Sequence, residues 1–65
     1  MRRERVHNEF EGIVLIKEAF KKGTEDKYDG TKFYTHEGDY LFKVEIRTTE
    51  FEVIYPTNNS VTIEL

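Results

Sequence analysis

The feature that most constrains this 65-residue chain is an alternation of apolar and polar residues from Tyr40 to Leu65. Successive side chains of a β-strand point to opposite faces of a sheet, so a period of two predicts strands with one apolar face. Polar interruptions at 48–49 and 56–60 divide the stretch into three strands. We therefore expect an antiparallel meander whose apolar face must be covered by another element.

The turns also predict how the strands pair. A two-residue loop at 48–49 places apolar residues opposite one another, whereas a slip by one residue would bury charges. A short strand at 31–35, followed by a turn at 36–39, adds a fourth strand. The expected cross-strand pairs are Ile46–Phe51, Val44–Val53, Phe42–Tyr55, Val53–Ile63, Tyr55–Val61, Phe33–Phe42 and Thr35–Tyr40.

The segment from Asn8 to Gly23 has the end signals of a helix. Asn8 is a favoured N-cap residue, and Glu11 follows at the spacing of a capping box. Two lysines precede Gly23, which is typical of the residue that ends a helix. Gly12 and the β-branched residues close behind it favour a strand instead, which leaves a five-stranded all-β barrel as the alternative.

We therefore predict an α+β domain in which one N-terminal helix packs on a four-stranded antiparallel meander sheet. Residues 8–65 would form this single domain, and residues 1–7 a flexible basic arm. The segment 24–30 is expected to be a polar loop with Tyr28 as a surface aromatic. The expected core comprises Ile13, Ile16, Phe20, Phe33, Phe42, Val44, Ile46, Phe51, Val53, Val61 and Ile63.

Composition narrows the classes of function. The chain has no cysteine and two histidines, which argues against a disulfide, a zinc site or another cofactor. It has no apolar run of membrane-spanning length and no signal-peptide pattern, so we expect a cytoplasmic protein without a membrane partner. The net charge is -3, although residues 1–5 carry +2, and an acidic body argues against a generic nucleic-acid binder.

The polar face of the predicted sheet is the first candidate site. Glu45, Glu52 and Glu64 are expected side by side on three neighbouring strands, where they would form an acidic recognition surface for a basic partner protein. On the same face, Tyr34 and Leu41 are expected opposite each other with Ile54 nearby, which would form a small apolar patch. Both groups are therefore candidate partner-binding residues.

The leading hypothesis is a non-enzymatic small acidic interaction protein, a regulator or inhibitor of the kind that mobile elements also encode. The alternative is a nucleic-acid-binding module that uses Arg2, Arg3 and Arg5 together with the aromatic sheet surface. A minimal enzyme built on His36 is disfavoured because the sequence offers it no nucleophile or second catalytic group. Two exposed sheet edges, at 31–35 and 61–65, predict a homodimer.

Overall fold

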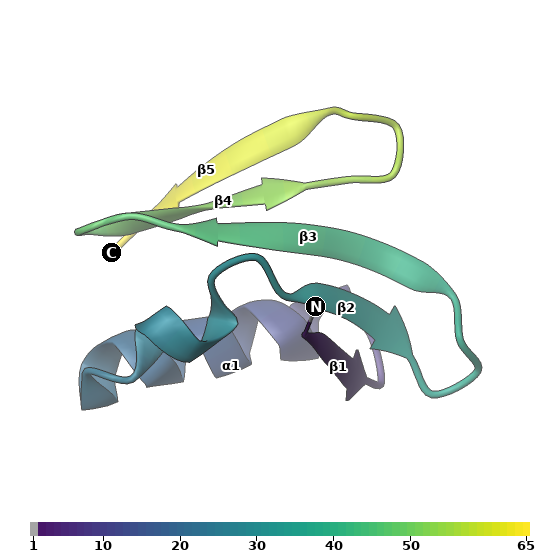
Figure 1. Cartoon of the computed structure of the whole chain (residues 1–65), viewed down its shortest axis with the longest axis horizontal. Helices are drawn as coiled ribbons and strands as arrows, with labels where there is room; N and C mark the ends of the chain where they lie inside the picture. The colour runs from purple at the N-terminus through teal and green to yellow at the C-terminus, as the bar shows by residue number, and fades with distance from the viewer. Residues whose placement is uncertain (1) are drawn as a thin grey trace.

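A computed structural model of the protein describes residues 2–65; Met1, the first residue of the expected arm, lies outside this range. One helix packs on one face of a five-stranded mixed sheet, which confirms the α+β class (Figure 1). The elements in chain order are β1 (Arg3–Val6), α1 (Glu9–Lys22), the 3-10 turn η1 (Glu25–Tyr28), β2 (Lys32–Thr35), β3 (Tyr40–Ile46), β4 (Glu50–Ile54) and β5 (Ser60–Glu64). The strands lie in the order β1-β2-β3-β4-β5.

The prediction of four antiparallel strands is wrong by one strand. Residues 3–6, which the sequence assigned to the flexible arm, form β1 and pair in parallel with β2. Val6 anchors this strand because its side chain is fully buried in the core. A parallel pair needs a crossover connection, and α1 with η1 supplies it. β1 also covers the edge of β2, so the segment 31–35 is not a free edge.

The helix has the predicted ends. The Asn8 side chain accepts a hydrogen bond from the Glu11 backbone N–H at 2.9 Å, and Gly23 closes the helix in the left-handed region at φ 71°. Gly12 favoured a strand in the sequence analysis, but packing explains why a glycine occurs inside this helix. A methyl group at this position would come within 2.9 Å of Phe42 Cζ. The glycine lets the helix approach the sheet closely, and the all-β alternative does not describe the structure.

The pairing of β3 with β4 is as predicted, with Val44 opposite Val53. The pairing of β4 with β5 differs by two residues, since Val53 faces Val61 and not Ile63. The turn explains the shift. Tyr55 O accepts from Asn58 N, Asn58 adopts φ 69°, and Tyr55 N donates to Asn59 O, which closes a short three-residue loop. A shift of two residues keeps every side chain on its expected face.

The pairing of β2 with β3 contains a bulge that the sequence did not predict. Phe33 faces Phe42 as expected, but Tyr34 then faces Tyr40. Leu41 is therefore the extra residue on β3 and packs against the core. Because of the extra residue, the alternation of side chains before the bulge is shifted by one, and the Tyr40 side chain lies beside Tyr34 on the polar face of the sheet.

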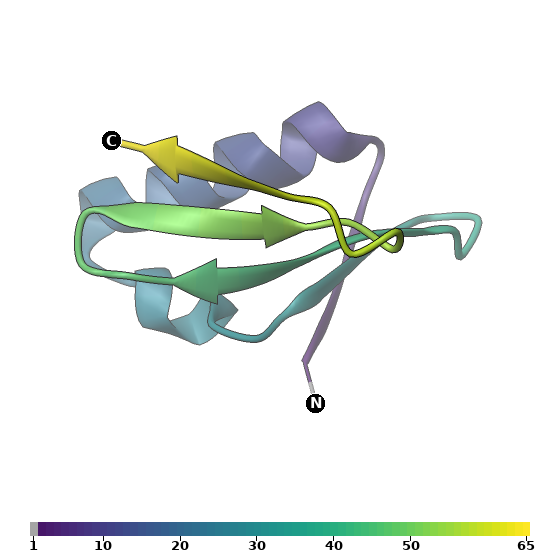
Figure 2. The ribbon, with the colours of Figure 1, turned by 90° about the horizontal axis from the view of Figure 1, so that it is seen from above.

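The core lies between α1 and the sheet and is built around stacked aromatic rings. The ring centroids of Phe33 and Phe42 lie 4.9 Å apart. The expected surface residue Tyr28 is buried, whereas the expected core residue Val61 is 50% exposed. Viewed from above, β5 forms the edge of the sheet and α1 lies behind the strands (Figure 2). Val61 is exposed because the helix covers the centre of the sheet better than this edge.

Candidate partner-binding face

The outer face of the sheet, which points away from α1, carries charges of both signs in separate regions. The acidic region lies on β3, β4 and β5 and consists of Glu45, Glu50, Glu52 and Glu64. The basic–aromatic region lies on β1, β2 and β3 and consists of Arg3, Arg5, Lys32, Tyr34, Tyr40 and Lys43. Both regions are fixed by strand register, because residues that lie opposite each other on neighbouring strands share a face of the sheet.

The acidic region contains two pairs of like charges that face each other across strands. Glu45 on β3 lies directly opposite Glu52 on β4, as the sequence predicted. Glu64 does not lie beside Glu52, because the two-residue shift of β5 places it opposite Glu50. Glu50 was missed as a site residue, although it shares the alternation of Glu52. Like charges in direct cross-strand positions destabilise a sheet.

Arg47 lies among three of these carboxylates. Its Nη2 donates a hydrogen bond to Glu52 Oε1 at 2.8 Å and lies 3.9 Å from Glu45 Oε1. Its Nε lies 4.0 Å from Glu50 Oε2. Lys43 Nζ adds a contact of 3.8 Å to Glu45 Oε2. These side chains are partly exposed, so each ion pair contributes at most about 1 kcal/mol, and four carboxylates face only two cations.

The basic–aromatic region continues the same face to the other edge of the sheet. Arg3, Lys32 and Lys43 form one row across three neighbouring strands. Within residues 2–65, neither Arg3 nor Lys32 has a carboxylate within ion-pair distance. The two lie over aromatic rings instead: the Arg3 guanidinium carbon is 5.3 Å from the Tyr34 centroid, and Lys32 Nζ is 5.9 Å from that of Tyr40.

The arginines of the expected arm have separate positions. Arg3 lies on the outer face, and the Arg5 side chain donates to Thr35 O at 3.2 Å. The Arg2 guanidinium turns to η1, where it donates to the backbone oxygens of Asp26 and Lys27. The nucleic-acid hypothesis therefore keeps Arg3 and Arg5 on one strand beside Tyr34, whereas Arg2 contacts a different part of the fold.

The prediction that Tyr34, Leu41 and Ile54 form an apolar patch on the outer face is wrong. Tyr34 faces Tyr40 and contacts its ring at a centroid distance of 5.3 Å. Leu41 packs against the core, because the bulge turns it away from the outer face. Ile54 lies opposite Lys43, on the strand beyond β3. These three residues therefore form no common surface, and Tyr40 takes the position beside Tyr34.

His36, the centre of the disfavoured enzyme hypothesis, lies against His7. Their ring centroids are 4.5 Å apart, and His7 Nδ1 lies 2.8 Å from Glu11 Oε2. The hydrogen bond from His7 lowers the pKa of the Glu11 carboxyl below its usual value. Within residues 2–65, no three histidine or carboxylate side chains are grouped so as to hold a metal ion. The arrangement ties the end of β1 to the first turn of α1.

Comparison with known proteins adds no constraint on function. No protein-family model, no curated protein and no solved structure matches this chain. Within residues 2–65, no helix has the length and apolar character needed to cross a membrane. The choice between functions therefore depends on the two charged regions of the outer face.

Proposed function

We propose that the protein is a non-enzymatic regulator or inhibitor that binds a partner protein with a basic surface through the acidic region. The observation that supports this proposal is the presence of two like-charged cross-strand pairs, Glu45 opposite Glu52 and Glu50 opposite Glu64. The protein acts in the cytoplasm as a homodimer, and self-association does not use the carboxylates of the acidic region.

Two facing pairs of carboxylates lower the stability of the folded protein when no partner is bound. Each unfavourable cross-strand pair is worth about 0.2–1 kcal/mol, and Arg47 and Lys43 offset only part of the repulsion. Lysine or arginine side chains of a partner would neutralise the remaining negative charge. Such a surface also raises the rate of encounter with a cationic partner, and the effect weakens with salt.

The proposal is tested by the binding of a fluorescently labelled lysine-rich peptide, measured by anisotropy at low and physiological salt. Replacing Glu45, Glu52 and Glu64 by Gln should weaken binding at least about tenfold, which corresponds to a loss of about 1.4 kcal/mol. The control triple variant, Glu18→Gln, Glu37→Gln and Asp39→Asn, removes the same charge from exposed positions outside the acidic region. Equal losses in both variants would contradict a specific acidic site.

A second candidate function is the binding of single-stranded nucleic acid by the basic–aromatic region. The observation that favours it is β1, which brings Arg3 and Arg5 beside the ring pair of Tyr34 and Tyr40. Cations that contact phosphates and rings that stack on bases are the two components of such sites, and stacking contributes about 1–3 kcal/mol per base.

A labelled oligothymidylate tests this second function in the same assay. Tyr34→Ala with Tyr40→Ala should weaken oligonucleotide binding and leave peptide binding unchanged. If the oligonucleotide binds with low-micromolar affinity at physiological salt and the peptide does not bind, the second function replaces the first.

A further inference from the structure

Four large apolar side chains are exposed on α1 and at the C-terminal end of the chain. Phe10 is 75% exposed and Val14 37%, and these residues share one face of α1 because they are four positions apart. Val61 is 50% exposed and Leu65 58%, although Val61 points to the same side of the sheet as the buried Val53. The helix therefore leaves the apolar side of β5 only partly covered, with Ile63 packed against the core and Val61 exposed.

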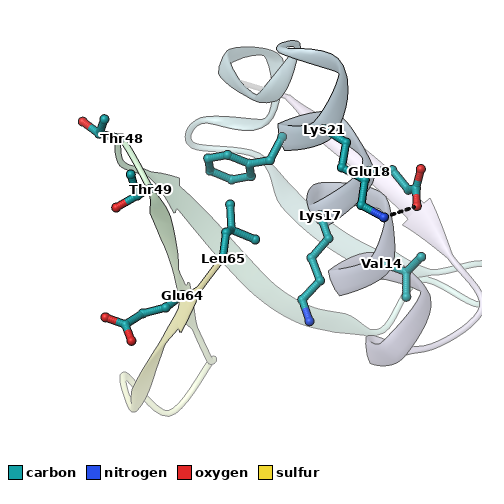
Figure 3. Close-up of a pocket in the computed structure, with 9 residues that line it drawn as sticks. Val14, Lys17, Glu18, Lys21, Thr48, Thr49, Glu64 and Leu65 are labelled. Carbon is teal, nitrogen blue, oxygen red and sulfur yellow. Dashed lines mark ion pairs between the residues drawn. The ribbon is translucent and has the colours of Figure 1, made fainter.

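A groove of about 740 Å³ separates α1 from the end of β5. Val14 and Lys17 line it from the helix, and Leu65 lines it from the sheet side. Leu65 points into this space, whereas the Glu64 carboxylate points away from it (Figure 3). The colour gradient in both overall views shows α1 and β5 running in the same direction (Figures 1 and 2). Of the four exposed apolar side chains, Val14 and Leu65 therefore face each other across this groove, while Phe10 and Val61 lie outside it.

The backbone of β5 is open along its outer edge. Tyr55 N donates to Asn59 O and Leu65 N donates to Thr49 O, so the backbone groups of odd-numbered residues point to β4. Those of Ser60, Thr62 and Glu64 then point away from the sheet. The strand pairs regularly, contains no proline and carries a single charge at Glu64. An edge of this kind is available for pairing with another strand.

The opposite edge of the sheet is protected by charge. β1 carries Arg3, Glu4 and Arg5 in succession. If two copies of β1 paired in antiparallel fashion about Glu4, arginine would face arginine and glutamate would face glutamate. The same operation on β5 about Thr62 places Glu64 opposite Ser60 and Val61 opposite Ile63, with no like-charged pair. The absence of facing like charges therefore favours β5 over β1 as the edge that accepts a second copy of this chain.

We propose that two copies associate through antiparallel pairing of β5 about a two-fold axis at Thr62. This pairing joins two five-stranded sheets into one, and both helices lie on the same side of it because the axis is perpendicular to the sheet. Val61 of each copy packs against Ile63 of the other, and the two grooves, each at the Leu65 end of its own β5, lie at opposite ends of the paired strands. The interface uses the backbone edge and the helix side of β5. Failure of the dimer test would therefore not contradict the proposed function of the outer face, and failure of the proposed function would not contradict the dimer.

Cross-linking tests this geometry directly, because the chain contains no cysteine. In the proposed dimer the two Thr62 residues form a central pair with Cα atoms about 5.5 Å apart. Thr62→Cys with a short bismaleimide should therefore give a covalent dimer in high yield. Thr57→Cys is the control: Thr57 lies in the exposed β4–β5 turn, and the two copies of this turn lie at opposite ends of the paired strands.

Sedimentation equilibrium supplies an independent measurement. The wild type should have about twice the 7.8 kDa mass of one chain, and Val61→Lys should be monomeric with an unchanged circular dichroism spectrum. Thr57→Lys adds the same charge outside the interface and should remain dimeric. A wild type that is monomeric at high micromolar concentration, a folded Val61→Lys that dimerises normally, or equal cross-linking at positions 57 and 62 would overturn the proposal.

Discussion

At the scale of single residues, the clearest lesson comes from Gly12. Sequence reasoning treats a mid-helix glycine as unfavourable, because alanine has the better helix propensity by about 1 kcal/mol. The structure shows what the glycine permits: Phe42 and Phe33 occupy the space in which a side chain would begin. Propensity describes the isolated helix, whereas this position is decided by how closely the helix approaches the sheet.

Gly12→Ala should therefore destabilise the protein despite the gain in helix propensity. A methyl group 2.9 Å from Phe42 Cζ forces a fully buried ring to move, and overpacking of this kind costs about 1–3 kcal/mol. Urea denaturation should show a lower free energy of unfolding than the wild type. Lys17→Ala, on the exposed side of the same helix, is the matched control and should change stability little; a more stable Gly12→Ala would contradict the packing account.

The hydroxyl of Tyr55 gives a prediction for alkaline pH. It donates a hydrogen bond to Glu9 Oε1 at 2.8 Å, which ties the end of β4 to the first turn of α1. Partial burial, and then this bond, raise the pKa of Tyr55 above its ordinary value of 10.0. The folded state thus favours the protonated hydroxyl, and its contribution to stability is complete below about pH 10 and is lost as pH rises through the raised pKa.

Tyr55→Phe should cost about 1 kcal/mol at neutral pH through loss of the hydrogen bond. In urea denaturation the difference between wild type and variant should shrink as the pH rises above 10. Tyr28 and Tyr40 also have pKa values raised by burial, so the comparison with Tyr55→Phe is needed to isolate one hydroxyl. A stability difference that does not change with pH would contradict this assignment.

At the scale of elements, local signals predicted most of the secondary structure. The cap at Asn8, the end at Gly23 and the alternation after Tyr40 each act over a few residues, and each is confirmed. β1 was missed because its charged residues show no apolar alternation, and only its distant partner β2 reveals the strand. The bulge at Leu41 has no sequence signal either, and it is what places Tyr40 in the basic–aromatic region.

The candidate site was predictable to the extent that it follows from alternation. Glu45 and Glu52 were placed correctly opposite each other, because the loop at 48–49 fixes their register. Glu64 lies on the predicted face of the sheet, but it faces Glu50 and not Glu52, because the turn closed by Asn58 is shorter than expected. The division of the face into two regions of opposite sign depends on β1 and the bulge, so the sequence alone did not show it.

Glu64→Gln should stabilise the protein. The substitution removes the negative charge that faces Glu50 and breaks no observed ion pair among residues 2–65. The expected gain in the free energy of unfolding is about 0.2–1 kcal/mol, and it should diminish at high salt. Glu18→Gln makes the same change in charge but loses the contact to Lys21 at 3.8 Å, so it should give no gain. A destabilised Glu64→Gln would contradict the view that this pair is a cost to the fold.

At the scale of the whole molecule, the charges are separated and not balanced. The chain carries a net charge of -3, yet one half of its outer face is basic and the other half acidic. The helix side provides the core and, at β5, the proposed contact with a second copy. In the proposed dimer the outer face would remain available for a partner, and its acidic region would be present twice.

The most direct test of the central claim is amide chemical-shift mapping by NMR during titration with the lysine-rich peptide. We predict saturable shifts in β3, β4 and β5 around Glu45, Glu52 and Glu64 that disappear at high salt, with little change around Arg3 and Lys32. Shifts confined to β1 and β2, shifts scattered over the surface, or no saturable shifts would contradict the assignment of the acidic region as the partner site.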